Sequence, residues 1–258
     1  ISACEKGFRH DMARFLLDEM TSKSLEPDVF AYNATIRACA KRKDWEWALA
    51  LLAEMKDKGV SPDEMTYTAC IYACGSSRQW QWALALLEEM KQRGFDPDLI
   101  VYHSAIHVCE KGGQWEWVLA LLQEMKQRSI DPDMATYVAV MKACRHGAQW
   151  EWALALLEEM KEKGFDPDAS TYSAAIGACK KGNQWEWVLV LLKEMQSRAI
   201  EPDVTTYNAA LSACVTNEQL EWALALLEEM TQKQLKPSRE TLKALLPACE
   251  RQQGRSGQ

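Results

Sequence analysis

Apolar residues along this chain form two helical patterns separated by a short polar turn, and the pair of patterns recurs every 35 residues. In the segment 29–63, Tyr32 and Ile36 follow helical spacing in the first pattern, and Leu52 and Met55 do so in the second. No alternation of the kind that predicts strands interrupts the two patterns. The sequence therefore predicts an all-α protein in which each repeat contributes two antiparallel helices.

The 35-residue period is carried by residues of one type at equivalent positions. All prolines but one keep this step, at Pro27, Pro62, Pro97, Pro132, Pro167, Pro202 and Pro237. A fixed period between about 20 and 50 residues indicates stacked repeats that bury a shared core. We therefore expect one α-solenoid (superhelix) over residues 1–258. Its full repeats are 29–63, 64–98, 99–133, 134–168, 169–203 and 204–238, with partial repeats at 1–28 and 239–258.

Glycines and repeat prolines mark the expected helix ends. Gly112, Gly147 and Gly182 follow the first helix, where a left-handed residue is expected, and Gly59 marks the end of the second helix. Asp63 directly follows a repeat proline, so we expect its side chain to accept hydrogen bonds from the first N–H groups of the next helix.

Pairs of tryptophans open most of the second helices, as in Trp80 and Trp82. Residues two apart on a helix do not share a face. We therefore expect one ring to pack between repeats and the other to lie partly exposed near the turn. Leu220 replaces the first tryptophan in the last full repeat, which favours packing over base stacking at this position.

Composition narrows the classes of chemistry. Hydrophobic residues make up 48% and charged residues 26% of the chain, values that are ordinary for an ordered protein. The nine cysteines are expected to be free, because stacked helices lie about 9–10 Å apart and a disulfide needs Cα atoms within about 7 Å. No CxxC spacing indicates zinc, and no apolar run approaches the ~20 residues of a membrane span. We expect no cofactor, no metal and no membrane partner.

The repeat resembles the P-type pentatricopeptide repeat. The matching features are its 35-residue length, the Tyr32-Asn33 opening of the first helix, the A-L-x-L-L-x-E-M pattern of the second helix and the terminal Pro62-Asp63. Tetratricopeptide repeats are similar, but they run 34 residues with a different Trp-Leu-Gly-Tyr pattern. The resemblance implies binding of single-stranded RNA, with one base read by two or three side chains of each repeat.

The resemblance further implies that each base is read by the residue after the repeat tyrosine together with the residue after the repeat proline. Asn33 with Asp63 resembles a uracil-reading pair, Thr68 with Asp98 and Ser173 with Asp203 resemble guanine-reading pairs, and Asn208 with Ser238 resembles a cytosine-reading pair. His103 with Asp133 and Val138 with Asp168 depart from the common pairs, so the two central bases stay unassigned. If the RNA runs 5′ to 3′ along the protein from N to C terminus, the implied site is about six nucleotides, 5′-U-G-N-N-G-C-3′.

Two further sets of residues follow from the resemblance. Base sandwiching is implied for the residues two before the repeat tyrosine, namely Phe30, Met65 and Ile100, whereas the later Ala135, Ser170 and Thr205 are small or polar. Phosphate contacts are implied for basic residues at the end of the first helix, namely Lys6, Lys41, Lys111 and Lys181. Ser76 and Thr216 interrupt this row, so we expect moderate affinity with a shallow salt dependence.

The formal net charge of −7 argues against nucleic-acid binding and leaves an alternative open. A protein-binding scaffold that uses the concave face of the solenoid would fit this acidity and the two off-pattern pairs. Against the scaffold, four of the six positions after the repeat tyrosine hold Asn, Thr or Ser. His103 and His107 lack an obvious third metal ligand, and no catalytic grouping is recognisable, so we expect no enzyme activity. The resemblance also implies an organelle, either a mitochondrion or a plastid.

Overall fold

The computed structural model describes residues 10–42, 44–75, 78–239 and 242–243. Its helices are α2 (His10–Ser22), α3 (Val29–Lys41), α4 (Trp45–Asp57), α5 (Glu64–Gly75), α6 (Trp80–Gln92), α7 (Leu99–Lys111), α8 (Trp115–Gln127), α9 (Met134–His146), α10 (Trp150–Glu162), α11 (Ala169–Lys181), α12 (Trp185–Ser197), α13 (Val204–Thr216) and α14 (Leu220–Gln232). The described residues contain no strand, which confirms the all-α class. None of these helices is long and apolar enough to cross a membrane.

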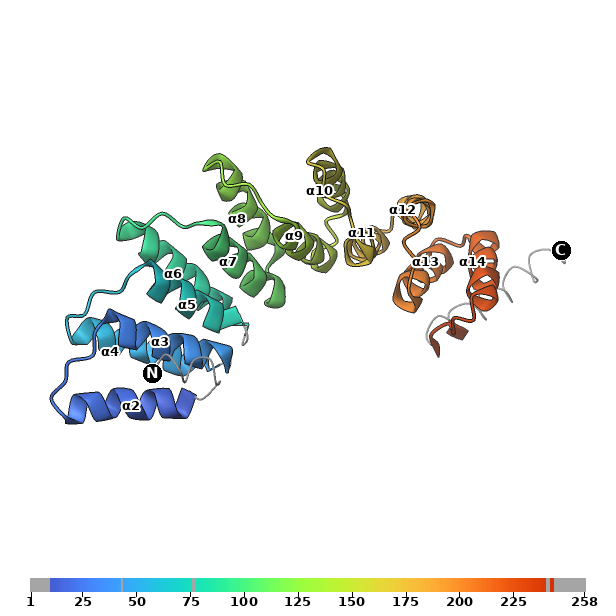
Figure 1. Cartoon of the computed structure of the whole chain (residues 1–258). Helices are drawn as coiled ribbons and strands as arrows, with labels where there is room; N and C mark the ends of the chain where they lie inside the picture. The colour runs from blue at the N-terminus through green and yellow to red at the C-terminus, as the bar shows by residue number, and fades with distance from the viewer. Residues whose placement is uncertain (1–9, 43, 76–77, 240–241, 244–258) are drawn as a thin grey trace, which may run out of the picture. The chain divides into compact units, whose positions relative to one another are not determined.

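The chain divides into two compact units, residues 1–136 and 137–258. In the first unit, α5 packs on α6 within one repeat and on both α3 and α7 of the neighbouring repeats, as Figure 1 shows. In the second unit, α11 packs on α12 and on α13 in the same way. The first helices α3, α5, α7, α11 and α13 each pack on their own second helix and on at least one neighbouring first helix, which is the stacking that the period predicts.

The residue after each repeat proline begins the first helix as expected. The side chain of Asp98 accepts a hydrogen bond from the backbone N–H of Val101 at 3.0 Å, and Asp168 accepts one from Thr171 at 2.8 Å. Such caps satisfy N–H groups that have no partner within the helix, and they contribute about 1 kcal/mol each. The predicted capping role of Asp63 is confirmed by its 2.8 Å contact with the N–H of Thr66.

The prediction that Gly112, Gly147 and Gly182 adopt the left-handed conformation is wrong by one residue. Gly112 and Gly182 have φ of −78° and −77°, which any residue can adopt. The left-handed residue comes next, as Gly113 (φ 73°) and Asn183 (φ 59°), and Ala148 after Gly147 does the same (φ 55°). After the second helices the expectation is confirmed, because the φ of Gly59 is 73°.

The tryptophans explain why glycine stands where no positive φ requires it. A Cβ placed on Gly112 would lie 2.8 Å from Cδ1 of Trp80, and Trp150 crowds Gly182 in the same way. The first tryptophan of a pair therefore packs between repeats, as predicted, while the second is 52% exposed at Trp82.

Replacing Gly112 with alanine is expected to lower the free energy of unfolding by about 1–2 kcal/mol, because the Trp80 ring must shift to admit the methyl group. Gly113→Ala is the matched control. Its φ of 73° makes alanine strained by about 1 kcal/mol, but no atom lies within 4 Å of the added Cβ. Urea denaturation of each single variant and of the pair Trp80→Leu/Gly112→Ala checks the cause. If Trp80→Leu does not relieve the Gly112→Ala cost, the ring is not responsible.

The core consists of one layer of side chains repeated along the chain. The six tyrosines of the repeat are fully buried, together with Met55, Met90, Met125, Met160, Met195 and Met230. The seven cysteines among the described residues are buried and free, as expected. Burial raises the pKa of Cys109 to about 12, and the pKa of Cys179 rises to about 12 for the same reason.

These cysteines are therefore expected to resist alkylation while the protein is folded. At about pH 8, a thiol with a pKa near 12 is ionised to roughly one part in ten thousand, and the thiolate is the reactive form. Iodoacetamide labelling of a Cys4→Ser/Cys249→Ser variant, followed by mass spectrometry, checks this, with the guanidinium-unfolded protein as control. Equal labelling rates in the two states would contradict the buried assignment.

Candidate functional site

The two residues of the first predicted base-reading pair are hydrogen-bonded to each other. Asn33 on α3 donates a hydrogen bond from Nδ2 to Oδ1 of Asp63 at 2.9 Å. The single hydroxyl hydrogen of Thr66 has two acceptors within reach, Oδ1 of Asn33 at 2.6 Å and Oδ1 of Asp63 at 2.8 Å. The carboxylate of Asp63 thus caps α5 and orients the amide of Asn33 in the preceding repeat. Thr66, the residue before the repeat tyrosine, joins the two side chains, and the sequence patterns did not indicate this role.

The amide of Asn33 keeps one N–H donor and one oxygen lone pair free for a further partner. It is also nearly covered, since only 3% of Asn33 is exposed. The equivalent residues of the later repeats are half-buried and more accessible (Thr68, His103, Val138, Ser173 and Asn208). Hydrogen bonds from Asn33 and Thr66 outweigh the opposing effect of burial and hold the pKa of Asp63 below its ordinary value.

His103 is linked to its partner in the same way. Its Nδ1 lies 3.1 Å from the hydroxyl oxygen of Thr136, which donates to Oδ1 of Asp133 at 2.7 Å. Burial would raise the pKa of Asp133, but the contacts with Thr136 and the nearby His103 lower it. The off-pattern pair His103 and Asp133 is therefore a connected group of polar side chains.

A pocket of about 540 Å³ brings two kinds of predicted residues together in the first unit. Met65 and Ile100 line it and are 52% and 62% exposed. Thr68 and Asp98, the second predicted pair, line the same pocket. The proposed sandwiching and base-reading side chains therefore surround a single space between neighbouring first helices. Phe30, the third predicted sandwiching residue, is 64% exposed on α3.

A second pocket, of about 230 Å³, lies beside this one and is bordered by basic residues. Met65, Thr68 and Ile100 line both pockets, and the second also contacts Arg37 and Lys41 of α3. We call the surface formed by these side chains of α3, α5 and α7 the first-helix surface. Lys41 was predicted to contact phosphate, whereas Arg37 was not.

The equivalent surface of the second unit holds a pocket of about 350 Å³, called here the basic pocket. It is lined by residues of α9, α11 and α13 and by Ser238: Arg145, Ser173, Gly177, Lys180, Lys181, Thr205, Asn208, Ala209, Ser212 and Ser238. Three of the predicted base-reading residues and the predicted Lys181 therefore share one site. Asn208 accepts a hydrogen bond at Oδ1 from the backbone N–H of Ser238 at 2.9 Å, which connects the last pair.

Sequence reasoning missed Arg145 and Lys180. Both stand one residue before the lysine row, at positions where other repeats carry Ala40 and Glu110, so no repeated signal marks them. Gly177 makes room for the arginine, since a Cβ at this glycine would lie 2.7 Å from Cδ of Arg145. The basic side chain can therefore lie along α11 and reach the pocket.

The remaining predicted residues show more varied surroundings. Lys111 lies 3.3 Å from the carboxylate of Glu110, so its charge is partly compensated. Lys6 lies outside the described residues. Asp168 and Asp203 cap α11 and α13, and Asp203 also accepts a hydrogen bond from Thr205 at 2.8 Å. His103 and His107 stack with ring centroids 6.4 Å apart, and no group of three potential metal ligands occurs among the described residues.

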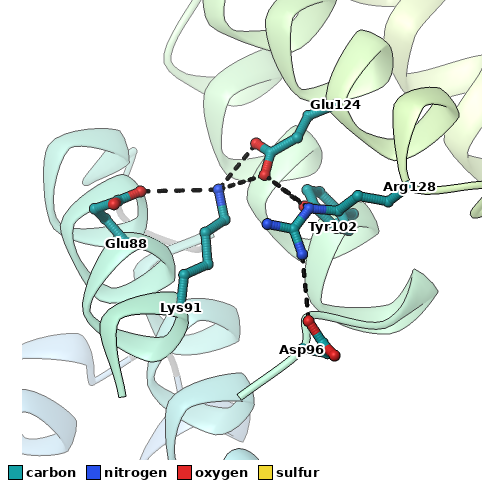
Figure 2. A network of polar contacts seen from close by, with 6 residues as sticks. All are labelled: Glu88, Lys91, Asp96, Tyr102, Glu124 and Arg128. Atoms are coloured by element: carbon teal, nitrogen blue, oxygen red, sulfur yellow. Dashed lines mark hydrogen bonds and ion pairs between the residues drawn. The ribbon is translucent and has the colours of Figure 1, made fainter. Parts of the chain in front are cut away.

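Many of the acidic residues take part in contacts on the second helices. Glu124 on α8 accepts a hydrogen bond from the Tyr102 hydroxyl at 2.8 Å. It also forms an ion pair with Lys91 of the preceding repeat at 2.6 Å (Figure 2). Arg128 lies 3.3 Å from the same carboxylate and 3.4 Å from Asp96. Burial alone would raise the pKa of Glu124, but the Lys91 and Tyr102 contacts lower it.

The same arrangement recurs along the chain. Tyr67 donates to Glu89, which pairs with Lys56, and Tyr172 donates to Glu194, which pairs with Lys161. In the fifth full repeat, Gln196 stands at the position of the lysine, and it donates a hydrogen bond to Glu229 of the last full repeat at 2.6 Å. The glutamate directly before the second-helix methionine thus joins successive repeats, and its charge is compensated locally. The net charge of −7 is therefore a poor guide to the first-helix surface.

Sequence profiles of known families match most of the chain. The profile described as pentatricopeptide repeat domain matches residues 85–147, 121–182 and 190–251. The PPR repeat family profile matches residues 27–76, and a PPR repeat profile matches residues 65–95 and 170–200. A search of curated proteins found no match.

Solved structures share the fold. The pentatricopeptide repeat protein PPR10 from maize is 29% identical, with a TM-score of 0.69 over 97% of this chain and 36% of that chain. PPR10 in complex with an 18-nt psaJ RNA element is 21% identical, with a TM-score of 0.57 over 96% and 41%. The PPR domain of Arabidopsis thaliana protein-only RNase P 1, in complex with tRNA, is 15% identical, with a TM-score of 0.61 over 70% and 95%. This chain thus spans well under half of the PPR10 chains.

Proposed function

The chain belongs to the pentatricopeptide repeat family, and from this premise we propose that it binds single-stranded RNA with one base per repeat. Two of the similar structures are complexes with RNA, PPR10 with an 18-nt psaJ element and the PPR domain of protein-only RNase P 1 with tRNA, which supports the same class of ligand here. The proposed role is binding without catalysis, in organellar RNA processing, stability or translation.

The observation that carries the proposal is that predicted base-reading residues share a pocket with basic side chains in the second unit and with exposed apolar side chains in the first. In the basic pocket, Ser173 and Asn208 offer hydrogen-bond donors and acceptors to base edges. Arg145, Lys180 and Lys181 border the same pocket and can neutralise phosphates. In the first unit, the exposed apolar side chains stand beside Thr68, where they can hold a base from both sides.

The proposed target is 5′-U-G-N-N-G-C-3′, with the first base read by Asn33 and Asp63 and the last by Asn208 and Ser238. The hydrogen bond between Asn33 and Asp63 supports this assignment, because it leaves the amide with one donor and one acceptor, which a uracil edge can match. The residues of the third and fourth full repeats differ from the common pairs, so the proposal leaves the middle two bases free.

Selection from a randomised RNA pool, followed by fluorescence anisotropy, tests the proposal. The expected result is enrichment of sequences related to U-G-N-N-G-C and weaker binding of a scrambled hexamer in the same flanking sequence. Recovery of RNA without any preferred sequence would reject base reading, while recovery of none would favour the protein-scaffold alternative.

A further inference from the structure

The second tryptophan of each pair forms a feature that RNA binding on the first helices leaves unused. We call these residues the tryptophan row: Trp47, Trp82 and Trp117 in the first unit and Trp152, Trp187 and Trp222 in the second. All of them lie in the first turn of a second helix and have exposed side chains; Trp117, for example, is 48% exposed. Large apolar side chains that remain exposed in a regular series mark an interaction surface.

Cations already occupy two rings of this row. The guanidinium carbon of Arg14 on α2 lies 3.2 Å from the ring centroid of Trp47. The ammonium of Lys193 on α12 lies 5.0 Å from the ring of Trp222. In both cases the cation comes from the preceding second helix, and in both the distance falls within the ~6 Å range of cation–π attraction. The exposed rings are therefore oriented so that a positively charged group can reach their faces.

The position of Lys193 carries an acid in two of the preceding full repeats, at Glu88 and Glu158, and an uncharged residue in two others, at Ala53 and Gln123. Glu88 has the same 29-residue spacing to Trp117 as Lys193 has to Trp222, and Glu158 has it to Trp187. The side chains of Glu88 and Glu158 are 61% and 65% exposed. Glu158 is already paired with Lys161 at 2.7 Å, whereas the lysine nearest to Glu88 lies 3.8 Å away, so Glu88 is the more available carboxylate. A cation from another molecule could therefore contact the ring and the carboxylate together.

The lysine next to Glu88 does not cancel this negative charge. Lys91 lies 3.8 Å from Glu88 but 2.6 Å from Glu124, and Figure 2 shows it between the two carboxylates. The network in Figure 2 contains three carboxylates, Glu88, Asp96 and Glu124, and two cations, Lys91 and Arg128. Further exposed acids, Glu116, Glu151 and Glu186, precede tryptophans of the row by one residue.

This charge pattern separates the tryptophan row from the first-helix surface. Indole rings can stack on nucleic-acid bases, but RNA phosphates would meet Glu88 and Glu116 beside Trp117, and like charges repel. A positively charged peptide gains from both the rings and the acids.

We infer that the tryptophan row of the first unit binds an extended, Lys- or Arg-rich segment of a partner protein, whose cations stack on Trp82 and Trp117 and pair with Glu88. Successive repeats lie about 9–10 Å apart, and an extended chain advances about 3.3 Å per residue, so a cation at every third residue would match successive rings. This role is additional to RNA binding, and it uses the second helix of each repeat, whereas RNA is proposed to bind the first helices.

The test uses the full chain and a labelled peptide of four Arg-Ser-Ser triplets, with four Gln-Ser-Ser triplets as the uncharged control. Fluorescence anisotropy is expected to show binding of the arginine peptide only. Trp82→Leu/Trp117→Leu is expected to weaken it about 10-fold, because each exposed cation–π contact accounts for about two- to fivefold. The same variant should keep its RNA affinity and its helical circular-dichroism signal.

A charge variant keeps the test decisive if loss of the tryptophans disturbs folding. Position 88 is equivalent to position 193 in a later repeat, where Lys193 lies over the Trp222 ring. Glu88→Lys therefore places a lysine where it can cover the Trp117 ring from within the chain. It is expected to weaken arginine-peptide binding about fivefold. The inference is overturned if the arginine and glutamine peptides bind alike, if neither variant changes peptide affinity, or if RNA displaces the peptide.

Discussion

Replacing Asn33 with threonine is expected to change the preferred base at the first RNA position from uracil to guanine and to leave the other positions unchanged. The substitution recreates the Thr68 and Asp98 combination of the next repeat, because Asp63 is retained. A hydroxyl cannot provide the amide's separate donor and acceptor, so the uracil contact is lost. Well-formed hydrogen bonds to a base edge discriminate by about 1–3 kcal/mol, so the guanine-to-uracil affinity ratio should rise about 10- to 100-fold.

Anisotropy titrations with four RNAs that differ only at the first base measure this ratio. Asn217→Thr is the matched control, since Asn217 stands at the end of α13 and donates to Asn183 at 3.0 Å, away from the proposed bases. The control should bind all four RNAs as the parent protein does. A uniform loss for Asn33→Thr, accompanied by a lower melting temperature, would instead identify Asn33 as a structural residue, as its 3% exposure also permits.

Much of the fold could be predicted because a repeat shows the same physical requirement several times. Buried tyrosines, methionines and cysteines recur because each stacked helix pair needs the same core, and the capping aspartate recurs because every first helix has unpaired N–H groups. The position of the left-handed residue could not be predicted in this way. Glycine is needed at position 112 because a Cβ there would collide with the Trp80 ring. The left-handed conformation is adopted by residues as different as Gly113, Ala148 and Asn183.

The candidate site was only partly predictable for a related reason. Equivalent positions in the repeats indicate Asn33 and Asp63, but the sequence does not show which side chains are in contact across repeats. Thr66 links this pair through hydrogen bonds that depend on the stacking of α3 on α5. Arg145 reaches the basic pocket because Gly177 in the next repeat is small, and the other described repeats hold no glycine at the position of Gly177.

The acidic composition also needed the structure for its interpretation. Carboxylates such as Glu89 and Glu194 pair with lysines of the preceding repeat, and they have lowered pKa values because hydrogen bonds from lysine and tyrosine exceed the effect of burial. The stability that they contribute is present above the ordinary pKa of glutamate and is lost as the pH falls through their lowered values. These acids therefore form contacts between helices, while Arg145, Lys180 and Lys181 of the second unit border the basic pocket.

Removing the three cations of the basic pocket is expected to have the largest effect on RNA affinity. The variant Arg145→Gln/Lys180→Gln/Lys181→Gln removes the three basic side chains of the pocket that we propose to contact phosphates. Each contact with single-stranded nucleic acid contributes about 0.7 to the slope of log affinity against log salt, so the slope should fall by about two. At roughly 0.1 M salt, this corresponds to about 100-fold weaker binding. The preference among bases should persist, because phosphate contacts carry no sequence information.

A second triple variant separates the pocket from general charge effects. Lys163→Gln/Lys193→Gln/Arg198→Gln makes the same change in net charge, but these residues lie on α12 or directly after α10 and α12, outside the basic pocket. Anisotropy titrations at several salt concentrations should show a slope close to that of the parent protein for this variant. Equal losses in the two triples would mean that the chain attracts RNA only through its overall field, and that Arg145 and Lys180 do not contact phosphates. A loss confined to the first triple would place the RNA backbone along α9 and α11, beside the bases that Ser173 and Asn208 are proposed to read.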